Sequence, residues 1–115
     1  MPQYAILIYT DETALANMSQ HEFGQVLQEH KAFGAEHGAA LRGGSGLELT
    51  DTATSLRHDP SGRLLVTDGA FVETKEALGG YYIIEARDLD EAIEVAKHVP
   101  ARYGGVEIRP LRVVS

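Results

Sequence analysis

The sequence of 115 residues contains no cysteine, so it can form neither a disulfide framework nor a thiolate site. The lack of disulfides fits a reducing compartment. The N-terminus, Met1-Pro2-Gln3-Tyr4, lacks the basic start of a signal peptide. The longest apolar run, residues 4–9, is far too short to span a bilayer. We therefore expect a cytoplasmic protein that does not insert into a membrane.

Basic residues are also scarce. Ten lysines and arginines stand against 17 aspartates and glutamates, for a formal net charge of −7. Proteins that bind nucleic acids usually carry the opposite balance, and no lysine or arginine cluster occurs here. We expect a small molecule or a protein as partner, and no nucleic acid. No repeat, low-complexity segment or linker divides the chain, which predicts a single domain over residues 1–115.

Two helices have clear start signals. Ser19 with Glu22 forms a capping box, and Asp88 with Glu91 forms another. The first helix is expected to stop at Gly38. Residues at helical spacing mark its buried face, and these are Phe23, Val26, Leu27, His30, Phe33 and Gly34.

The remaining apolar segments predict strands. Asp59-Pro60-Ser61-Gly62 joins two of them into a hairpin, because proline at the second position and glycine at the fourth favour a turn. Loops are expected over residues 11–18 and over the glycine-rich residues 43–46, followed by a strand extension over 47–50. The predicted strands cover residues 4–9, 39–42, 52–58, 63–67, 80–86 and 106–114.

This order of elements predicts an α+β fold, a ferredoxin-like split βαβ sandwich with an extra β-hairpin and both helices on one face of the sheet. Successive strand side chains point to opposite faces, and residues 4–9 and 80–86 are apolar on both. The helices can cover only one face. A second copy is the simplest cover for the other, which predicts a homodimer in the form of a dimeric α+β barrel. The alternative is a monomer whose open face is shielded by the long middle segment.

One segment concentrates charge between glycines. Asp68, Glu73, Lys75 and Glu76 lie within nine residues, and a glycine pair closes the segment before an apolar strand. We call residues 68–82 the motif segment. Its density of ionisable groups makes it the first place to look for function.

The motif segment resembles the signature of the YCII-related, DGPF-type domain proteins. The family's proline is Ala70 here, a change that removes no side-chain chemistry. The resemblance spans nearly the whole chain. The residues that carry it are Asp68-Gly69-Ala70-Phe71-Val72-Glu73-Thr74-Lys75-Glu76, Gly79-Gly80-Tyr81-Tyr82, Asp88-Leu89-Asp90-Glu91-Ala92-Ile93-Glu94 and Val106-Glu107-Ile108-Arg109-Pro110.

The resemblance implies a ferredoxin-like fold that dimerises through its sheet. For the wider group it implies a pocket with a histidine and an aspartate, similar to small dehalogenating and isomerising enzymes of aromatic degradation. The DGPF-type branch is often associated with extracytoplasmic-function sigma factors. The first predicted helix of this chain carries a histidine, His30, and the family motif carries an aspartate, Asp68.

The candidate residues each have a structural alternative. Asp68 begins a turn, where an aspartate either caps local amides or acts as a general acid or base. Glu73, Lys75 and Glu76 form either a solvated turn with a weak ion pair or a site where Lys75 binds an anion and a carboxylate moves a proton. The alternatives stay open for these residues.

Three further residues lie outside the charged loop. His30, on the apolar face of the first helix, is either a hydrogen-bonded core residue or a titrating histidine near a pocket. Arg57 either clamps an anion with its planar guanidinium or lies on the surface. Tyr82 either packs in the core or forms a pocket wall. No histidines have metal-ligand spacing, and we expect neither metal nor cofactor.

Two hypotheses follow. The first is a cofactor-free protein that binds a small, anionic organic molecule at the dimeric sheet, with acid-base chemistry of the lyase, isomerase or dehalogenase kind. The second is a non-enzymatic sensor or interaction module linked to sigma-factor regulation, in which the charged loop is a docking surface. A concave site with convergent polar groups would favour the first. Its catalytic candidates are Asp68, Glu73 and His30, and its ligand-binding candidates are Lys75, Glu76, Arg57 and Tyr82.

Overall fold

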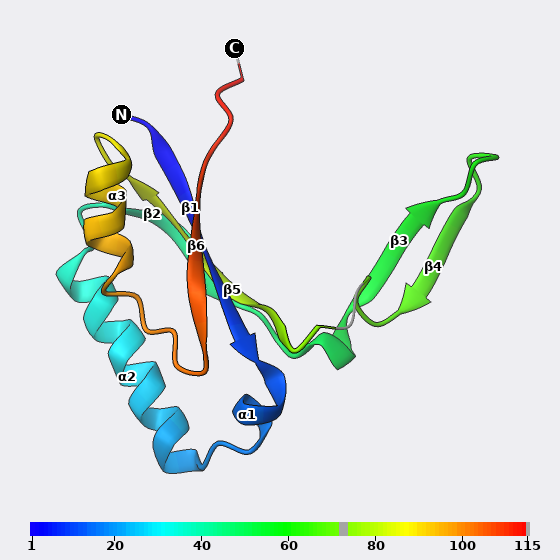
Figure 1. Ribbon diagram of the computed structural model, residues 1–115, viewed down its shortest axis with the longest axis horizontal. Coiled ribbons are helices and arrows are strands. Elements are labelled where there is room, and N and C mark those ends of the chain that lie inside the picture. The colour runs from blue at the N-terminus through cyan, green and yellow to red at the C-terminus, as the bar shows by residue number, and fades with distance from the viewer. Residues whose placement is uncertain (72–73, 115) are drawn as a thin grey trace.

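The computed structural model describes residues 1–71 and 74–114 and shows one mixed sheet-and-helix body with a projecting hairpin (Figure 1). The elements in chain order are β1 (Gln3–Asp11), α1 (Glu12–Ala16), α2 (Gln20–Glu36), β2 (Leu41–Gly46), the 3-10 helix η1 (Thr50–Thr52), β3 (Thr54–His58), β4 (Leu64–Asp68), β5 (Glu76–Glu85), α3 (Leu89–Ala96) and β6 (Gly104–Pro110).

Four strands form the main sheet in the order β2-β5-β1-β6, and every neighbouring pair is antiparallel. The helix α2 joins β1 to β2 around β5, and α3 joins β5 to β6 around β1, which is split βαβ connectivity. Both helices lie on the same side of the sheet (Figure 1). The predicted α+β fold with an added hairpin is therefore confirmed.

The predicted helix starts are confirmed by their caps. Ser19 Oγ accepts a hydrogen bond from the backbone N–H of Glu22 at 3.1 Å, and Asp88 Oδ1 accepts one from Glu91 at 2.9 Å. The predicted loop over residues 11–18 is wrong in part. Asp11 caps the short helix α1 there, because its carboxylate accepts from two first-turn amides.

Several strand boundaries differ from the prediction. Residues 43–46 are strand rather than loop, because they pair with β5. The expected strand extension over residues 47–50 is absent, and the chain turns into η1 instead. The strand β5 begins at Glu76, four residues before the predicted Gly80, and β6 ends at Pro110 rather than Val114.

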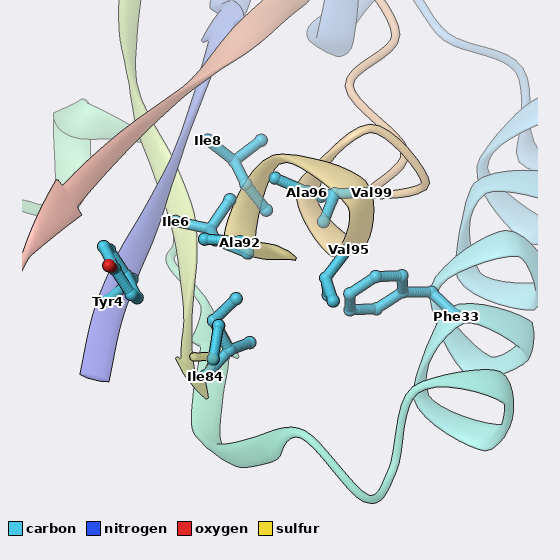
Figure 2. Close-up of a cluster of buried hydrophobic side chains, with 10 residues drawn as sticks. Tyr4, Ile6, Ile8, Phe33, Ile84, Ala92, Val95, Ala96 and Val99 are labelled. Carbon is cyan, nitrogen blue, oxygen red and sulfur yellow. The ribbon is translucent and has the colours of Figure 1, made fainter. Parts of the chain in front are cut away.

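The core lies between the sheet and the two helices. Ile6 and Ile84 are fully buried. Figure 2 shows Phe33 reaching from α2 towards Val95 of α3, while Ile6 and Ile8 of β1 lie against α3. Burying side chains of this size stabilises the fold by roughly 1.5–3 kcal/mol each.

The opposite face of the sheet has no layer of helices over it (Figure 1). The register places Leu7 of β1 opposite Tyr81 of β5, and Ala5 opposite Ile83. These residues alternate with the core residues, so they lie on the open face. Leu7, Tyr81 and Ile83 are each partly exposed. The sequence prediction that both faces are apolar is confirmed.

The strands β3 and β4 form a separate two-stranded sheet, which we call the arm (residues 54–68). The arm stands away from the body on the side opposite the helices (Figure 1). The alternative in which this middle segment folds over the open face is therefore wrong. The Asp59-Pro60-Ser61-Gly62 turn is confirmed, since Asp59 N–H donates to the Arg63 carbonyl at 2.9 Å and Gly62 has φ of +88°.

Candidate functional site

His30 and Tyr82 are the predicted site residues that the structure brings together. His30 Nδ1 lies 2.8 Å from the Tyr82 hydroxyl, across 52 positions of sequence. His30 comes from the middle of α2 and Tyr82 from the helix side of β5. Both side chains are partly buried. The two polar groups lie among apolar side chains, where each needs a hydrogen-bond partner. Each group supplies that partner to the other.

Burial sets the protonation of this pair. It lowers the pKa of His30 below its ordinary value of 6.5, and the nearby Glu29 carboxylate opposes this to a smaller extent. Burial also raises the pKa of Tyr82 above its ordinary value of 10.0. At neutral pH the imidazole is therefore neutral and the phenol keeps its proton.

The neutral pair has two arrangements. Either the Tyr82 O–H donates to His30 Nδ1, or a protonated Nδ1 donates to the phenol oxygen, which leaves Nε2 free of a proton. In the second arrangement Nε2 is a proton acceptor, as a general base requires. Both arrangements are electrically neutral, so neither places a charge inside the protein.

An aromatic row continues from this pair towards the end of α2. The Phe33 ring lies 4.9 Å from both the Tyr82 and His37 ring centroids. His37 then stacks on His98 at 5.2 Å. The Nε2 atom of His37 is buried and has no hydrogen-bond partner among the described residues. The row holds the Tyr82 ring from one side and so fixes the direction of its hydroxyl.

The sheet beneath this part of α2 carries glycines on its helix side. Gly44 pairs with Tyr82, and Gly46 pairs with Gly80, so all three glycines face the helix layer. We call them the glycine floor. A Cβ on Gly44 would lie 2.7 Å from the Tyr82 ring, so this glycine lets the ring lie across β2. A Cβ on Gly46 would meet no atom within 4 Å, which is open space.

The prediction of a buried face along the whole of α2 is wrong, because Phe33 is its one buried residue. Phe23 is 48% exposed and Leu27 is 53% exposed. The hydrophobic core takes Phe33 from α2 and neither of these two residues, so this half of the helix lies outside the core. Two large apolar side chains thus lie unpacked, one and two turns from His30.

The charged residues at the start of the motif segment lie apart from its last residue, Tyr82, and from the His30–Tyr82 pair. Asp68 ends β4, Lys75 precedes β5, and Glu76 begins it opposite Asp11. Asp68, Lys75 and Glu76 are all exposed. Glu73 lies outside the described residues. The side chain of Asp68 makes no hydrogen bond to the described part of the chain, so the expected local capping is not seen there.

Arg57 lies on the arm. Its guanidinium carbon is 4.1 Å from the centre of the Phe71 ring, a cation–π contact at the surface. The arm, whose strand β3 carries Arg57, and α2, which carries His30, lie on opposite sides of the main sheet (Figure 1). Within one chain, Arg57 therefore does not join this polar pair in a single site.

Two shallow depressions flank α2, and neither is lined by a predicted site residue. The first, of about 460 Å³, lies between α2 and the segment that leads to β6. The second, of about 760 Å³, follows the outer face of α2. Arg102 lines both and pairs with Glu29 at 2.8 Å. Arg102 is the cation that could otherwise bind an anionic ligand there, and its ion pair with Glu29 already engages it.

No group of three or more histidine or carboxylate side chains in residues 1–71 and 74–114 is arranged to hold a metal ion. None of the helices in this part of the chain is both long enough and apolar enough to cross a membrane.

One structural contact between distant residues was not predicted from the sequence. Glu12 accepts hydrogen bonds from the backbone N–H of Thr50, at 2.9 Å, and from its hydroxyl. This clamp fixes η1 at the root of the arm. The sequence offers no local signal for it, because the two residues are 38 positions apart.

The fold and the motif segment together place the protein in the class of small α+β proteins with a split βαβ sheet. A family model, the YCII-related domain, matches residues 2–115. The chain is also 36% identical to an uncharacterised protein of Rhizobium meliloti (strain 1021) over 113 residues, which cover 94% of this chain and 90% of the relative. The chain belongs to the YCII-related family, and the resemblance inferred from the motif segment is confirmed.

Proposed function

We propose that the protein binds a small organic molecule between α2 and the glycine floor, with His30 and Tyr82 as its acid-base pair. The observation that carries the proposal is the 2.8 Å contact between His30 Nδ1 and the Tyr82 hydroxyl. Phe23 and Leu27 lie on the same face of α2 as His30, and both are exposed. Gly46, two residues along β2 from the Gly44 that pairs with Tyr82, has open space at its Cβ position. This location is on the helix side of the sheet rather than at the charged residues of the motif segment.

The chemistry of the pair defines the class of ligand. A neutral imidazole accepts a proton from an acidic C–H or O–H group, and a phenol that keeps its proton donates to the resulting oxyanion. The ligand would therefore be an organic acid or a carbonyl compound that becomes anionic during reaction. Apolar side chains and a flat backbone floor favour an apolar body on that molecule. Such chemistry, of the isomerase, lyase or dehalogenase kind, needs no cofactor.

A homodimer formed through the open face is the second part of the proposal. Leu7, Tyr81 and Ile83 form an apolar surface there that the arm of the same chain does not cover. Stacking two such faces about 10 Å apart would complete a dimeric α+β barrel. Leu7→Asp is expected to weaken dimerisation by about a hundredfold, because it buries a charge. Light scattering measures this, with Leu89→Asp, an exposed position on α3, as control.

A thermal-shift screen of metabolites tests the ligand site. Tyr82→Phe removes the hydroxyl that contacts His30, whereas Tyr81→Phe changes the neighbouring tyrosine on the open face. A ligand of the proposed site raises the melting temperature of the wild type and of Tyr81→Phe, and raises that of Tyr82→Phe much less. A ligand that stabilises all three proteins equally would contradict the proposed site.

A second candidate function rests on a different observation. The described charged residues of the motif segment, Asp68, Lys75 and Glu76, are exposed and line neither depression. This suits a docking surface for a regulatory protein such as an extracytoplasmic-function sigma factor. Calorimetric titration of a purified sigma factor against the wild type and Lys75→Glu tests it. Binding that is unchanged by Lys75→Glu would count against a role of this loop.

A further inference from the structure

The arm has apolar side chains that residues 1–71 and 74–114 leave largely uncovered. Leu56 of β3 lies opposite Val66 of β4, and Leu64 follows on the same face, next to the tip. All three are about half exposed or more, with Val66 at 60%. On the other face Leu65 lies opposite Arg57, whose guanidinium stacks on the exposed Phe71 ring. Both faces of the ribbon thus present apolar surface to their surroundings.

A two-stranded ribbon of this kind is marginally stable on its own in water. It also has two unpaired strand edges, which in soluble proteins are usually covered or blunted. The arm pairs with no strand of the main sheet. The apolar residues and the free edges therefore indicate a surface that is covered by another molecule.

Hydrogen bonds nevertheless hold the two strands of the arm together at both ends. At its root, Gly69 N–H donates to the Ala53 carbonyl at 2.7 Å, and the buried Ser55 hydroxyl donates to the Gly69 carbonyl at 2.6 Å. At its tip, Asp59 Oδ1 accepts hydrogen bonds from Ser61 and Arg63. These hydrogen bonds lower the pKa of Asp59, so the tip keeps its charge and its shape at neutral pH.

We propose that the arm of each chain packs against a second copy of the same chain, so that two arms clasp the dimer. The inference rests on the proposed open-face dimer. The arm and the uncovered sheet face lie on the same side of the molecule (Figure 1). When two open faces meet about a two-fold axis, the arm that projects on that side lies beside the partner, and the partner's arm returns the contact.

The charge distribution favours the same occupant. The arm holds two arginines, Arg57 and Arg63, and two aspartates, Asp59 and Asp68, so its formal charge is zero. The full net charge of −7 therefore lies on the rest of the chain. Two acidic bodies repel each other, whereas a neutral arm can lie on an acidic body without that cost. An arm contact thus buries apolar surface in the dimer without adding charge repulsion between the two chains.

Excision of the arm tests the proposal. Since the Ala53 carbonyl and the Gly69 amide are in hydrogen-bond contact, a short glycine linker can replace residues 54–68 without moving the body. We expect the circular dichroism spectrum of the excised chain to keep the contribution of the helices and the main sheet and to lose that of the arm. In analytical ultracentrifugation the excised chain should dimerise at least about tenfold more weakly.

A point variant makes the test independent of the excision. Val66→Asp should weaken the dimer about tenfold, whereas Val113→Asp, the same change at a position 89% exposed outside the arm, should leave it unchanged. Because the chain has no cysteine, Val66→Cys also accepts a single environment-sensitive fluorophore. Its emission should shift to the blue as protein concentration drives dimerisation.

The outcomes separate the two proposals. A wild-type chain that remains monomeric overturns both the open-face dimer and the arm contact. A dimer that Leu7→Asp dissociates, but that neither the excision nor Val66→Asp weakens, overturns the arm contact and leaves the open-face dimer standing. Weakening by all three changes, with a blue shift at Val66→Cys, supports both.

Discussion

The two faces of the main sheet carry the same kinds of side chain under different cover. Tyr82 and Ile84 point to the helix side, where Ile84 is fully buried and Tyr82 contacts His30. Tyr81 and Ile83 are their neighbours in the chain, and they point to the open side, where each stays partly exposed. Apolar alternation thus identifies a surface that needs cover, and the elements on each side decide whether the chain itself supplies it.

The largest expected effect comes from the two isoleucines. Ile84→Ala should lower the free energy of unfolding by about 3 kcal/mol, because it leaves a cavity in a fully buried site. Ile83→Ala should cost about 1 kcal/mol or less in a monomer, because its side chain is already partly in water. Urea unfolding in the Leu7→Asp background measures both in the monomer. Equal losses there would remove the distinction between the faces.

The parts of the fold that were predictable have local causes. The capping residues Ser19 and Asp88 and the Asp59–Gly62 turn act within four residues, so the sequence displays them directly. The short helix α1 was missed although Asp11 caps it, because its five residues are too few for a helical apolar stripe.

The parts that were not predictable depend on partners distant in sequence. Gly43 and Gly44 have low strand propensity, yet they are strand because β5 pairs with them from about 40 positions away. The sequence singled out both His30 and Tyr82 as candidates, but nothing local indicates that they meet. The motif segment identified the family and drew attention away from this pair, because a dense charged loop is the more visible feature.

The glycine floor offers a finer test of the helix side. Gly44→Ala should destabilise the fold by roughly 1–3 kcal/mol, because its Cβ would meet the Tyr82 ring and the Tyr81 carbonyl oxygen at 2.7 Å. Gly46→Ala should change stability by less than about 0.5 kcal/mol, because its Cβ enters open space.

Binding gives the second readout for this pair of variants. A ligand that lies on the floor should bind Gly46→Ala at least about tenfold more weakly, although the fold is intact. Thermal shift and calorimetric titration separate the two effects. Unchanged affinity in Gly46→Ala would place the ligand elsewhere.

The smallest expected effect is the pH dependence from His30. Its pKa is lowered in the folded chain below the ordinary 6.5 that the unfolded chain keeps. Between these two pKa values the unfolded state binds the extra proton, so acid favours unfolding. The stabilising contribution is complete above pH 6.5 and is lost as the pH falls towards the folded pKa. His30 lies on the helix side of the sheet, so this pH dependence does not depend on what covers the open face. It reports on the helix side alone.

Urea unfolding at about pH 7.5 and about pH 5.5 checks this expectation, with His30→Gln as the comparison. The wild type should lose more of its free energy of unfolding over this interval than the variant does, since glutamine cannot take up the proton. In Tyr82→Phe the wild-type pH dependence should largely remain, because burial of the imidazole, rather than its hydrogen bond, is the main cause of the lowered pKa. Equal pH dependence in the wild type and His30→Gln would show that the imidazole is as well hydrated as in the unfolded chain. That result would contradict the proposed acid-base role of the His30–Tyr82 pair.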